Sequence, residues 1–346
     1  RLSEICELEK GEIQSSKRIE GEYKLVSQSN SRTHNEYKYD GQNVFVSCVA
    51  RVGQMYYYEG KCHGTTLLYN LKIKEGVNIN SKYLYLVLYK NDKTFECEKG
   101  SANKSLDKDK FMKLKIPLPS LEIQEKIVEE LSMVETNITS IETRIKQLKE
   151  EKERFKKYSR KSEIKELLKD AEIKKLNEIM NVTGGKGEND RSKVETDEYN
   201  IPYYDSNGIT SYVKNSLYDG EYIITARKMS IGSVHFVKGK YYSSDNTINI
   251  TSMHGDTTLN TYFYYWLKFN NDILINMSSG IKPGIRMGEV RLLKIPYPSP
   301  EIQEQCIEIY KEKESFINSI DDKIEAEKKY IEELKQLSKD IIHNYC

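Results

Sequence analysis

Proline, tryptophan and long apolar runs are scarce in this sequence of 346 residues. It contains seven prolines and one tryptophan. Its longest apolar runs, such as residues 83–89, fall far short of the roughly 20 residues that a membrane-spanning helix requires. No charged segment followed by an apolar one opens the chain, so a secretion signal has no support. We therefore expect a cytoplasmic protein without a membrane partner.

Cysteine and histidine are also sparse, and they lack the spacing of a metal site. The six cysteines are scattered and form no CxxC pair, and the only adjacent Cys and His are Cys62 and His63. The pattern is typical of reduced thiols and offers neither a disulfide framework nor a zinc site. We expect no metal and no cofactor bound by this chain.

Neither sign of charge predominates over the whole sequence, because the net charge is +1 although 31% of the residues are charged. Residues 1–118 hold 20 basic and 15 acidic side chains, and residues 299–346 hold 7 and 12. General basicity therefore cannot indicate nucleic-acid binding, and any DNA-binding surface must be local.

Catalytic motifs are missing as well. No phosphate-binding loop or dinucleotide motif occurs, and the glycines of residues 184–187 are followed by Glu188 where a helix with a hydroxyl residue would be required. Residues 200–203 (Asn-Ile-Pro-Tyr) lack the first proline of the Asn-Pro-Pro-Tyr motif of amino-methyltransferases, and no glycine-rich cofactor motif precedes them. No pair of carboxylates recurs in both halves of the chain. The sequence predicts a binding protein rather than an enzyme.

What the sequence does contain is an internal duplication. Residues 115–125 (Lys-Ile-Pro-Leu-Pro-Ser-Leu-Glu-Ile-Gln-Glu) return as residues 294–304 (Lys-Ile-Pro-Tyr-Pro-Ser-Pro-Glu-Ile-Gln-Glu), 179 positions later. The same offset aligns residues 39–41 with 218–220 (Tyr-Asp-Gly) and Gly53 with Gly232. Near the start of each copy the offset is 174, so copy two carries about five extra residues, which we place around residues 183–198. On this alignment residues 201–207 correspond to residues 22–28.

Each copy begins with a strand-rich part. Residues 44–49 and 222–225 are short β-favouring runs, and residues 54–58 and 233–237 indicate a strand that ends in a turn at Gly60 and Gly239. Residues 81–89 and 260–269 are apolar on every face and fit either a buried strand or a helix with a Ser or Asn cap. We favour the helix.

Each copy ends in a long helix with a heptad seam. Apolar residues recur at steps of four and three, in copy one at Ile123, Ile127, Leu131, Val134, Ile138, Ile141, Ile145 and Leu148. Copy two repeats the seam at Ile302, Cys306, Tyr310, Ile317, Ile320, Ile324, Ile331, Leu334 and Ile341. Because neither segment contains Pro or Gly beyond its first turn, we expect an unbroken helix over residues 122–169, about 70 Å long at 1.5 Å per residue.

These observations predict an α+β fold with two tandem-duplicated domains and two long helices that pair as an antiparallel coiled coil with pseudo-two-fold symmetry. The predicted boundaries are 1–118 for the first domain, 119–170 for the first helix, 171–298 for the second domain and 299–346 for the second helix. The less favoured interpretation is two domains attached to unrelated coiled coils.

Candidate recognition residues lie in polar loops at equivalent places in the two copies. Arg, Lys, Asn and Gln are the side chains that form bidentate contacts with guanine and adenine edges. The 26 tyrosines could stack on bases, but strand and core packing explains most of them. The candidates for DNA contact are Asn30, Arg32, His34, Asn35, Arg51, Asn103, Lys104, Asn207, Lys214, Arg227, Lys228, Lys282 and Arg286.

The duplicated arrangement closely resembles the DNA specificity subunit of Type I restriction–modification systems. Residues 115–125 and 294–304 are similar to that family's Ile-Pro-x-Pro-x-x-Glu-x-Gln sequence, which precedes each conserved helix. Residues 2–5 (Leu-Ser-Glu-Ile) and 176–179 (Leu-Asn-Glu-Ile) resemble the start of each target-recognition domain. The resemblance covers essentially the whole chain.

The resemblance implies a non-catalytic subunit whose two domains each read one half of a split, asymmetric DNA target, while the helices fix the gap between the halves. It also implies two methyltransferase subunits, which bind S-adenosylmethionine and methylate adenine, and restriction subunits that cleave. Two alternatives remain open: the specificity subunit of a related system in which one polypeptide both cuts and methylates, and a coiled-coil scaffold that binds protein instead of DNA. A stand-alone methyltransferase is disfavoured by the missing cofactor motif.

Overall fold

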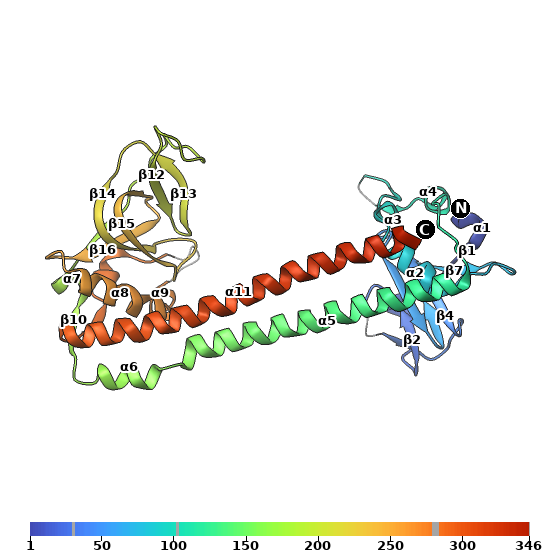
Figure 1. The fold of residues 1–346 in the computed structure, drawn as a ribbon, viewed down its shortest axis with the longest axis horizontal. Coiled ribbons are helices and arrows are strands. Elements are labelled where there is room, and N and C mark those ends of the chain that lie inside the picture. The colour runs from blue at the N-terminus through green and yellow to red at the C-terminus, as the bar shows by residue number, and fades with distance from the viewer. Residues whose placement is uncertain (30–31, 102–103, 279–283, 346) are drawn as a thin grey trace. The chain divides into compact units, whose positions relative to one another are not determined.

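The computed structural model describes residues 1–29, 32–101, 104–278 and 284–345, and the chain divides into two compact units (Figure 1). Unit 1 comprises Arg1–Lys146 and Ile324–Cys346, and unit 2 comprises Gln147–Lys323. Each unit contains one globular domain, called domain one and domain two below, and one part of each long helix. Among the described residues, no helix combines the length and apolar character needed to cross a bilayer.

Domain one is built on two small sheets. A four-stranded sheet has the order β1-β7-β4-β5, a three-stranded sheet has the order β3-β2-β6, and β8 pairs with β9. The elements of domain one are α1 (Leu2–Ile5), β1 (Cys6–Lys10), the 3-10 turn η1 (Ser15–Lys17), β2 (Tyr23–Val26), β3 (Thr33–His34), β4 (Gln42–Ser47), β5 (Met55–Glu59), β6 (Cys62–Gly64), β7 (Leu68–Ile73), α2 (Ser81–Tyr89), α3 (Asp92–Phe95), β8 (Glu98–Lys99), β9 (Ser105–Leu106) and α4 (Lys108–Met112).

Domain two has one six-stranded sheet of order β11-β16-β14-β15-β12-β13, and β10 pairs with β17. The elements of domain two are β10 (Glu172–Lys175), α7 (Leu176–Ile179), β11 (Met180–Gly184), β12 (Ile201–Asp205), β13 (Gly208–Val213), β14 (Tyr218–Ala226), β15 (Val234–Ser243), β16 (Thr247–Ser252), α8 (Thr257–Phe269), α9 (Asp272–Met277), α10 (Met287–Arg291) and β17 (Lys294–Tyr297).

The strand pairing repeats in the two domains with the predicted offset. In domain one Val44 pairs with Tyr57, and in domain two Ile223 pairs with Phe236, which are the positions 179 residues later. The first strand of each domain repeats with the offset of 174, because Cys6 pairs with Ile73 and Met180 pairs with Ser252. The duplication predicted from the sequence is therefore present in the hydrogen-bonding register.

Two details of the predicted alignment are wrong. The turn expected at Gly239 does not form, because β15 continues through Lys238 and Gly239 to Ser243, with Gly239 paired to Gly220. β12 pairs with β15 in the same parallel way as β2 pairs with β6. This pairing aligns Tyr203 with Leu25, whereas the predicted alignment of residues 201–207 with 22–28 placed Tyr203 one residue earlier in domain one. Four of the five extra residues lie between β11 and β12. The fifth lies between β12 and β13, where the pairing shifts register after Tyr203.

The helices predicted from all-apolar runs are confirmed as α2 and α8, which pack on the sheets with Tyr83, Leu84, Tyr262 and Phe263 fully buried. The caps differ from the expected ones. The Asn80 side chain accepts hydrogen bonds from the amides of Lys82 and Tyr83, and the Asp256 side chain accepts one from the Leu259 amide. Both are preferred capping side chains. α2 spans the expected residues 81–89, whereas α8 begins at Thr257, three residues before the expected segment 260–269.

The long helices are α5 (Leu121–Tyr158) and α11 (Pro300–Tyr345), with α6 (Lys161–Leu167) after α5. The expected unbroken helix over residues 122–169 is wrong, because Arg160 has the left-handed φ of 53° and separates α5 from α6. No Pro or Gly marks this break. Most of the predicted seam residues are buried, among them Ile127, Leu131, Ile320 and Ile324. The exceptions are half-buried: Ile123, Ile138, Leu148 and Ile302.

Within each unit the two long helices run antiparallel. In unit 1, Glu130 accepts a hydrogen bond from Tyr345 at 2.9 Å, and Arg144 forms an ion pair with Glu327 at 2.5 Å. In unit 2, Lys152 contacts Asp321 at 2.5 Å, and the Phe155 and Phe316 rings lie 4.1 Å apart. As the residue number rises along α5 it falls along α11, which confirms the predicted antiparallel pairing in both units.

The repeated Ile-Pro-x-Pro-x-x-Glu-x-Gln sequence attaches each long helix to its domain. Gln124 and Gln303 are buried, and their Nε2 atoms donate to the Pro119 and Pro298 carbonyls at 2.9 and 3.0 Å. The first proline of each motif is held by a buried tyrosine of the preceding domain: the Tyr83 hydroxyl of α2 donates to the Pro117 carbonyl, and the Tyr262 hydroxyl of α8 donates to the Pro296 carbonyl, both at 3.1 Å. A proline carbonyl is a strong acceptor that needs a partner when buried, which gives the motif its structural role.

Candidate DNA-reading loops

Three loops of domain one converge beside the end of β4, and they contain most of that domain's predicted recognition residues. They are the segment after β2, the turn between β4 and β5, and the segment leading into β9. Gln28 Nε2 donates to the Val49 carbonyl at 2.7 Å and joins the first loop to the second. The Leu106 amide donates to the Cys48 carbonyl at 2.9 Å and joins the third loop to the second. We call this set loop cluster one.

Domain two builds loop cluster two in the same way. The Ser233 hydroxyl donates to the Ser206 carbonyl at 2.5 Å and joins the turn between β14 and β15 to the segment after β12. The Ile285 amide donates to the Arg227 carbonyl at 2.9 Å, which is the bond that Leu106 and Cys48 make in domain one. The bridges Val49–Ser105 and Lys228–Gly284 also correspond at an offset of 179. The convergence of these loops is therefore duplicated along with the sheets.

The central turn of each cluster holds a non-glycine residue in the left-handed region. Ala50 has φ 58° and Met229 has φ 65°, and the two positions are equivalent. This conformation costs on the order of 1–2 kcal/mol for a residue with a Cβ, so the joined loops must hold it in place. It turns Arg51 and Lys228 outward, and both side chains are exposed, as is Met229 at 70%.

Six predicted residues are presented to solvent without an acidic partner among the described residues: Asn35, Arg51, Asn207, Arg227, Lys228 and Arg286. The Arg51 guanidinium lies near the Tyr56 hydroxyl and lowers its pKa, against the larger upward effect of burial on that hydroxyl. Arg227 accepts the hydrogen bond from the Ile285 amide, and Arg286 follows Ile285, so the structure brings the loops of the two arginines together. These side chains are available for a polyanion.

Other predicted residues are engaged or interior. Lys104 pairs with Glu98 at 2.6 Å. Lys214 pairs with Glu198 at 2.8 Å and with Asp190 at 3.3 Å, and the hydrogen bond to Glu198 is the main cause of its raised pKa. Arg32 is half-buried. Asn30, Asn103 and Lys282 lie outside the described residues.

His34 does not fit the predicted role of a base contact. It is 5% exposed, its Nδ1 lies 3.0 Å from the Ile19 carbonyl, and its ring meets the His63 ring edge-on at 5.8 Å. A ring held between backbone and a second ring cannot reach a DNA groove without unfolding β3. Its position in a short alternating strand explains why it faces inward.

Sequence reasoning missed the residues that hold the loops. Gln28 and Ser233 carry the cross-links, and Ala50 and Met229 supply the left-handed turns. Their residue types carry no signal, since neither Ala nor Met favours a positive φ. The only available signal was the offset of 179, which aligns Ala50 with Met229.

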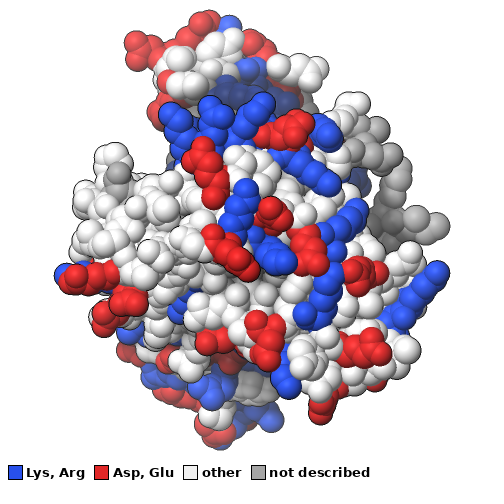
Figure 2. Space-filling view, turned by 90° about the vertical axis from the view of Figure 1, so that its right-hand side faces the viewer, with Lys and Arg blue, Asp and Glu red and all other residues white. Residues whose placement is uncertain are grey.

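Cysteine reactivity and metal binding find no support among the described residues. Burial raises the pKa of the Cys6 and Cys62 thiols to about 12, so both are protonated at neutral pH. No group of three His, Cys, Asp or Glu side chains within residues 1–29, 32–101, 104–278 and 284–345 could hold a metal ion. Figure 2 shows basic and acidic side chains interspersed over the face it displays.

Comparison with known proteins gives one consistent result. A sequence model for the family "Type I restriction modification DNA specificity domain" matches residues 1–150 and 168–336. The specificity subunit of the type I restriction enzyme EcoprrI of Escherichia coli is 28% identical over 150 residues, which cover 42% of this chain and 37% of that protein. The match thus spans well under half of that relative.

Solved structures agree on the fold. The S subunit of a Type-I restriction-modification system from M. genitalium matches 99% of this chain and 94% of its own, with a TM-score of 0.55 and 19% identity. A chain of the type I R-M system, from work on its complex assembly and conformational transition, matches 100% of this chain and 96% of its own, with a TM-score of 0.67 and 13% identity.

Proposed function

Because the chain belongs to the family of Type I restriction–modification DNA specificity domains, we propose that it is a non-catalytic subunit that reads a split, asymmetric DNA sequence. Each loop cluster contacts one half of the target. The observation that carries the proposal is that the two clusters share their backbone bonds but not their exposed side chains.

The side-chain differences support two different half-sites. Domain one has Cys48, Val49 and Arg51 where domain two has Arg227, Lys228 and Ser230. Arg reads guanine bidentately in the major groove, and Lys contacts guanine or phosphate, so moving the cation by three positions changes which base it meets. One scaffold with two side-chain sets gives an asymmetric target, whereas identical sets would give a symmetric one.

The weak overall charge supports a division of labour. Phosphate neutralisation supplies most non-specific DNA affinity, and a chain with a net charge of +1 provides little of it. We propose that two methyltransferase subunits dock on this chain and supply the remaining backbone contacts, S-adenosylmethionine binding and adenine methylation. Restriction subunits add cleavage. In a fused system a single partner polypeptide would provide both activities.

The test is selection from a random duplex pool by this chain co-expressed with its methyltransferase partner. The variant carries Arg227→Ala and Lys228→Ala, and the matched control carries Lys328→Ala and Lys329→Ala on the exposed side of α11. We expect base preference to weaken by about 1–3 kcal/mol per lost contact in one half of the selected sequence only. The control should select the unaltered sequence.

A scaffold that binds protein through its globular domains predicts a different outcome. In that case no sequence is enriched by the co-expressed complex, and the Arg227/Lys228 variant behaves like its control. Enrichment of a symmetric sequence would contradict the assignment of one half-site to each cluster.

A further inference from the structure

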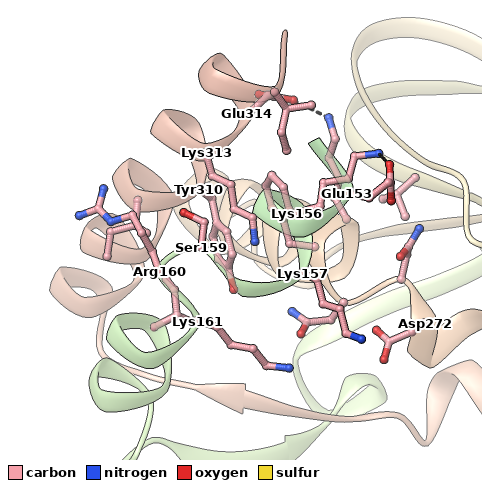
Figure 3. Close-up of a pocket in the computed structure, with 18 of the residues that line it drawn as sticks. Glu153, Lys156, Lys157, Ser159, Arg160, Lys161, Asp272, Tyr310, Lys313 and Glu314 are labelled. Carbon is pink, nitrogen blue, oxygen red and sulfur yellow. Dashed lines mark hydrogen bonds and ion pairs between the residues drawn. The ribbon is translucent and has the colours of Figure 1, made fainter. Parts of the chain in front are cut away.

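Unit 2 contains a cavity of about 760 Å³ where α5 ends, and Gly232, in the β14–β15 turn of loop cluster two, is among the residues that line it. Its lining includes six cations and three carboxylates, drawn from the break between α5 and α6, from the region of α8 and α9, and from α11 (Figure 3). The cations are Lys156, Lys157, Arg160, Lys161, Lys268 and Lys313, and the carboxylates are Glu153, Asp272 and Glu314.

Lys313 is the unusual member, because it occupies an apolar position of the heptad seam. It lies three residues after Tyr310 and four before Ile317, and its counterpart 179 residues earlier is Val134. Both side chains are buried, each with 6% exposure. At this seam position α5 therefore has an apolar residue, whereas α11 has a charged one.

No carboxylate among the described residues pairs with Lys313. Its Nζ lies 4.8 Å from the centre of the Phe269 ring, which is an attractive contact that leaves the charge unneutralised. Burial and the nearby Lys161 both lower its pKa. A buried charge without a counter-ion is costly, so its presence in place of valine requires an explanation.

The remaining charges leave room for an anion. Lys268 pairs with Glu314, Lys156 pairs with Glu153 at 3.0 Å, and Arg160 is bound to Glu163 and Glu312. Lys157, Lys161 and Lys313 have no acidic partner in the described part of the chain, and Asp272 is the one lining carboxylate without an ion pair there. The unpaired groups carry a net charge of two, which a phosphate dianion matches.

The arrangement also depends on the break at Arg160. Its left-handed conformation places Ser159 and Lys161 on the cavity lining, where an unbroken helix would follow a different path. Figure 3 shows Lys313 reaching inward from α11 toward Ser159 and Tyr310. A hydroxyl and several ammonium groups around an open volume are the donors that phosphate oxygens accept from.

We propose that this cavity binds the phosphate group of a small ligand, as inorganic phosphate or a phosphate monoester, with Lys313, Lys157 and Lys161 as its cations. The site belongs to unit 2 alone, since domain one has valine at the central position.

The experiment is ³¹P NMR titration of inorganic phosphate, and separately of glycerol 3-phosphate, with the full chain at constant ionic strength in chloride buffer. Lys313→Val copies the residue of domain one. Lys311→Val removes the same charge from an exposed position two residues away on the same helix. We expect wild type and Lys311→Val to bind alike, and Lys313→Val to bind at least tenfold more weakly.

Far-ultraviolet circular dichroism and thermal unfolding show whether each variant is folded. Equal binding by all three proteins, or no binding by wild type, would overturn the proposal. If neither phosphate compound binds but a duplex binds in a Lys313-dependent manner, the cavity serves the DNA backbone and the small-ligand proposal is also overturned.

Discussion

The two domains share one hydrogen-bonding register but differ in how they close their sheets. In domain two β15 runs unbroken from Val234 to Ser243 and pairs with β14 on one side and β12 on the other, so one six-stranded sheet forms. In domain one the equivalent chain is divided into β5 and β6 at Gly60 and Lys61, so two smaller sheets form. Every described backbone bond of the loop clusters survives this difference. The loop scaffold therefore does not depend on the continuity of the sheet.

The largest expected effect concerns the equivalent buried tyrosines. Tyr83→Ala and Tyr262→Ala each remove a fully buried ring and its bond to a proline carbonyl. We expect each to lower the free energy of unfolding by about 3–5 kcal/mol, measured by urea denaturation. Tyr→Phe at either position keeps the ring and should cost about 1 kcal/mol. A loss under 1 kcal/mol for one alanine variant alone would show that the two attachments are not equivalent.

A second prediction compares how strongly the equivalent substitutions Gly53→Ala and Gly232→Ala destabilise the two domains. Both have a positive φ, of 79° and 94°. A Cβ at Gly53 would lie 2.6 Å from the Thr94 carbonyl oxygen, whereas one at Gly232 would meet the flexible Ile275 side chain at 3.0 Å. We expect Gly53→Ala to destabilise by about 2–4 kcal/mol and Gly232→Ala by about 1–2 kcal/mol. Thermal unfolding of the two variants side by side measures the difference, and the reverse order would contradict it.

The attachment glutamines should also differ. Gln124 makes three bonds: it accepts from the Asn80 amide at 2.8 Å and donates to the Asn78 and Pro119 carbonyls. Gln303 has one, to Pro298. Gln124→Ala should cost about 2–3 kcal/mol and Gln303→Ala about 1 kcal/mol in urea denaturation, because buried unpaired groups are left behind. Equal costs would indicate that the bonds around Gln124 contribute little.

The smallest effect has the opposite sign. Without added phosphate, Lys313→Val should stabilise the chain by on the order of 1–2 kcal/mol, because it removes a buried unpaired charge. The pKa of Lys313 is lowered in the folded state. Between that pKa and the unfolded value near 10.5 the unfolded chain binds more protons, so wild-type stability rises with pH.

The advantage of Lys313→Val is therefore expected to be complete at pH 7 and to shrink as the pH rises toward 10.5. Urea denaturation of both proteins across this range measures it, with Lys311→Val as the control. A gap that stays constant or widens with pH would contradict the buried charge as its cause.

The sequence predicted most of the fold because the duplication doubled each weak signal. The offset of 179 relates the pair Val44–Tyr57 of domain one to the pair Ile223–Phe236 of domain two. The offset of 174 relates Cys6 of the first strand to Met180. Sequence patterns failed where a backbone conformation carries no residue preference. Arg160 breaks α5 without Gly or Pro, and Gly239 remains inside a strand where a turn was expected.

The candidate site was predicted at the level of loops but not of their contacts. Arg227, Lys228 and Arg286 do converge, because the Arg227–Ile285 bond joins their loops. His34 was misplaced, since burial of a polar ring between β3 and the His63 ring depends on tertiary packing. The sequence analysis did not single out Lys313, and only its burial at the position equivalent to Val134 makes it notable.

The central claim is that each domain reads its own half of one target. The most direct measurement is genome-wide mapping of methylated adenines by long-read sequencing, with this chain co-expressed with its methyltransferase partner and with residues 1–118 exchanged for the corresponding domain of a relative. We predict a split asymmetric motif in which the exchange alters one half and leaves the other half and the gap unchanged. A motif that is unaffected by the exchange, or altered in both halves, would contradict the account.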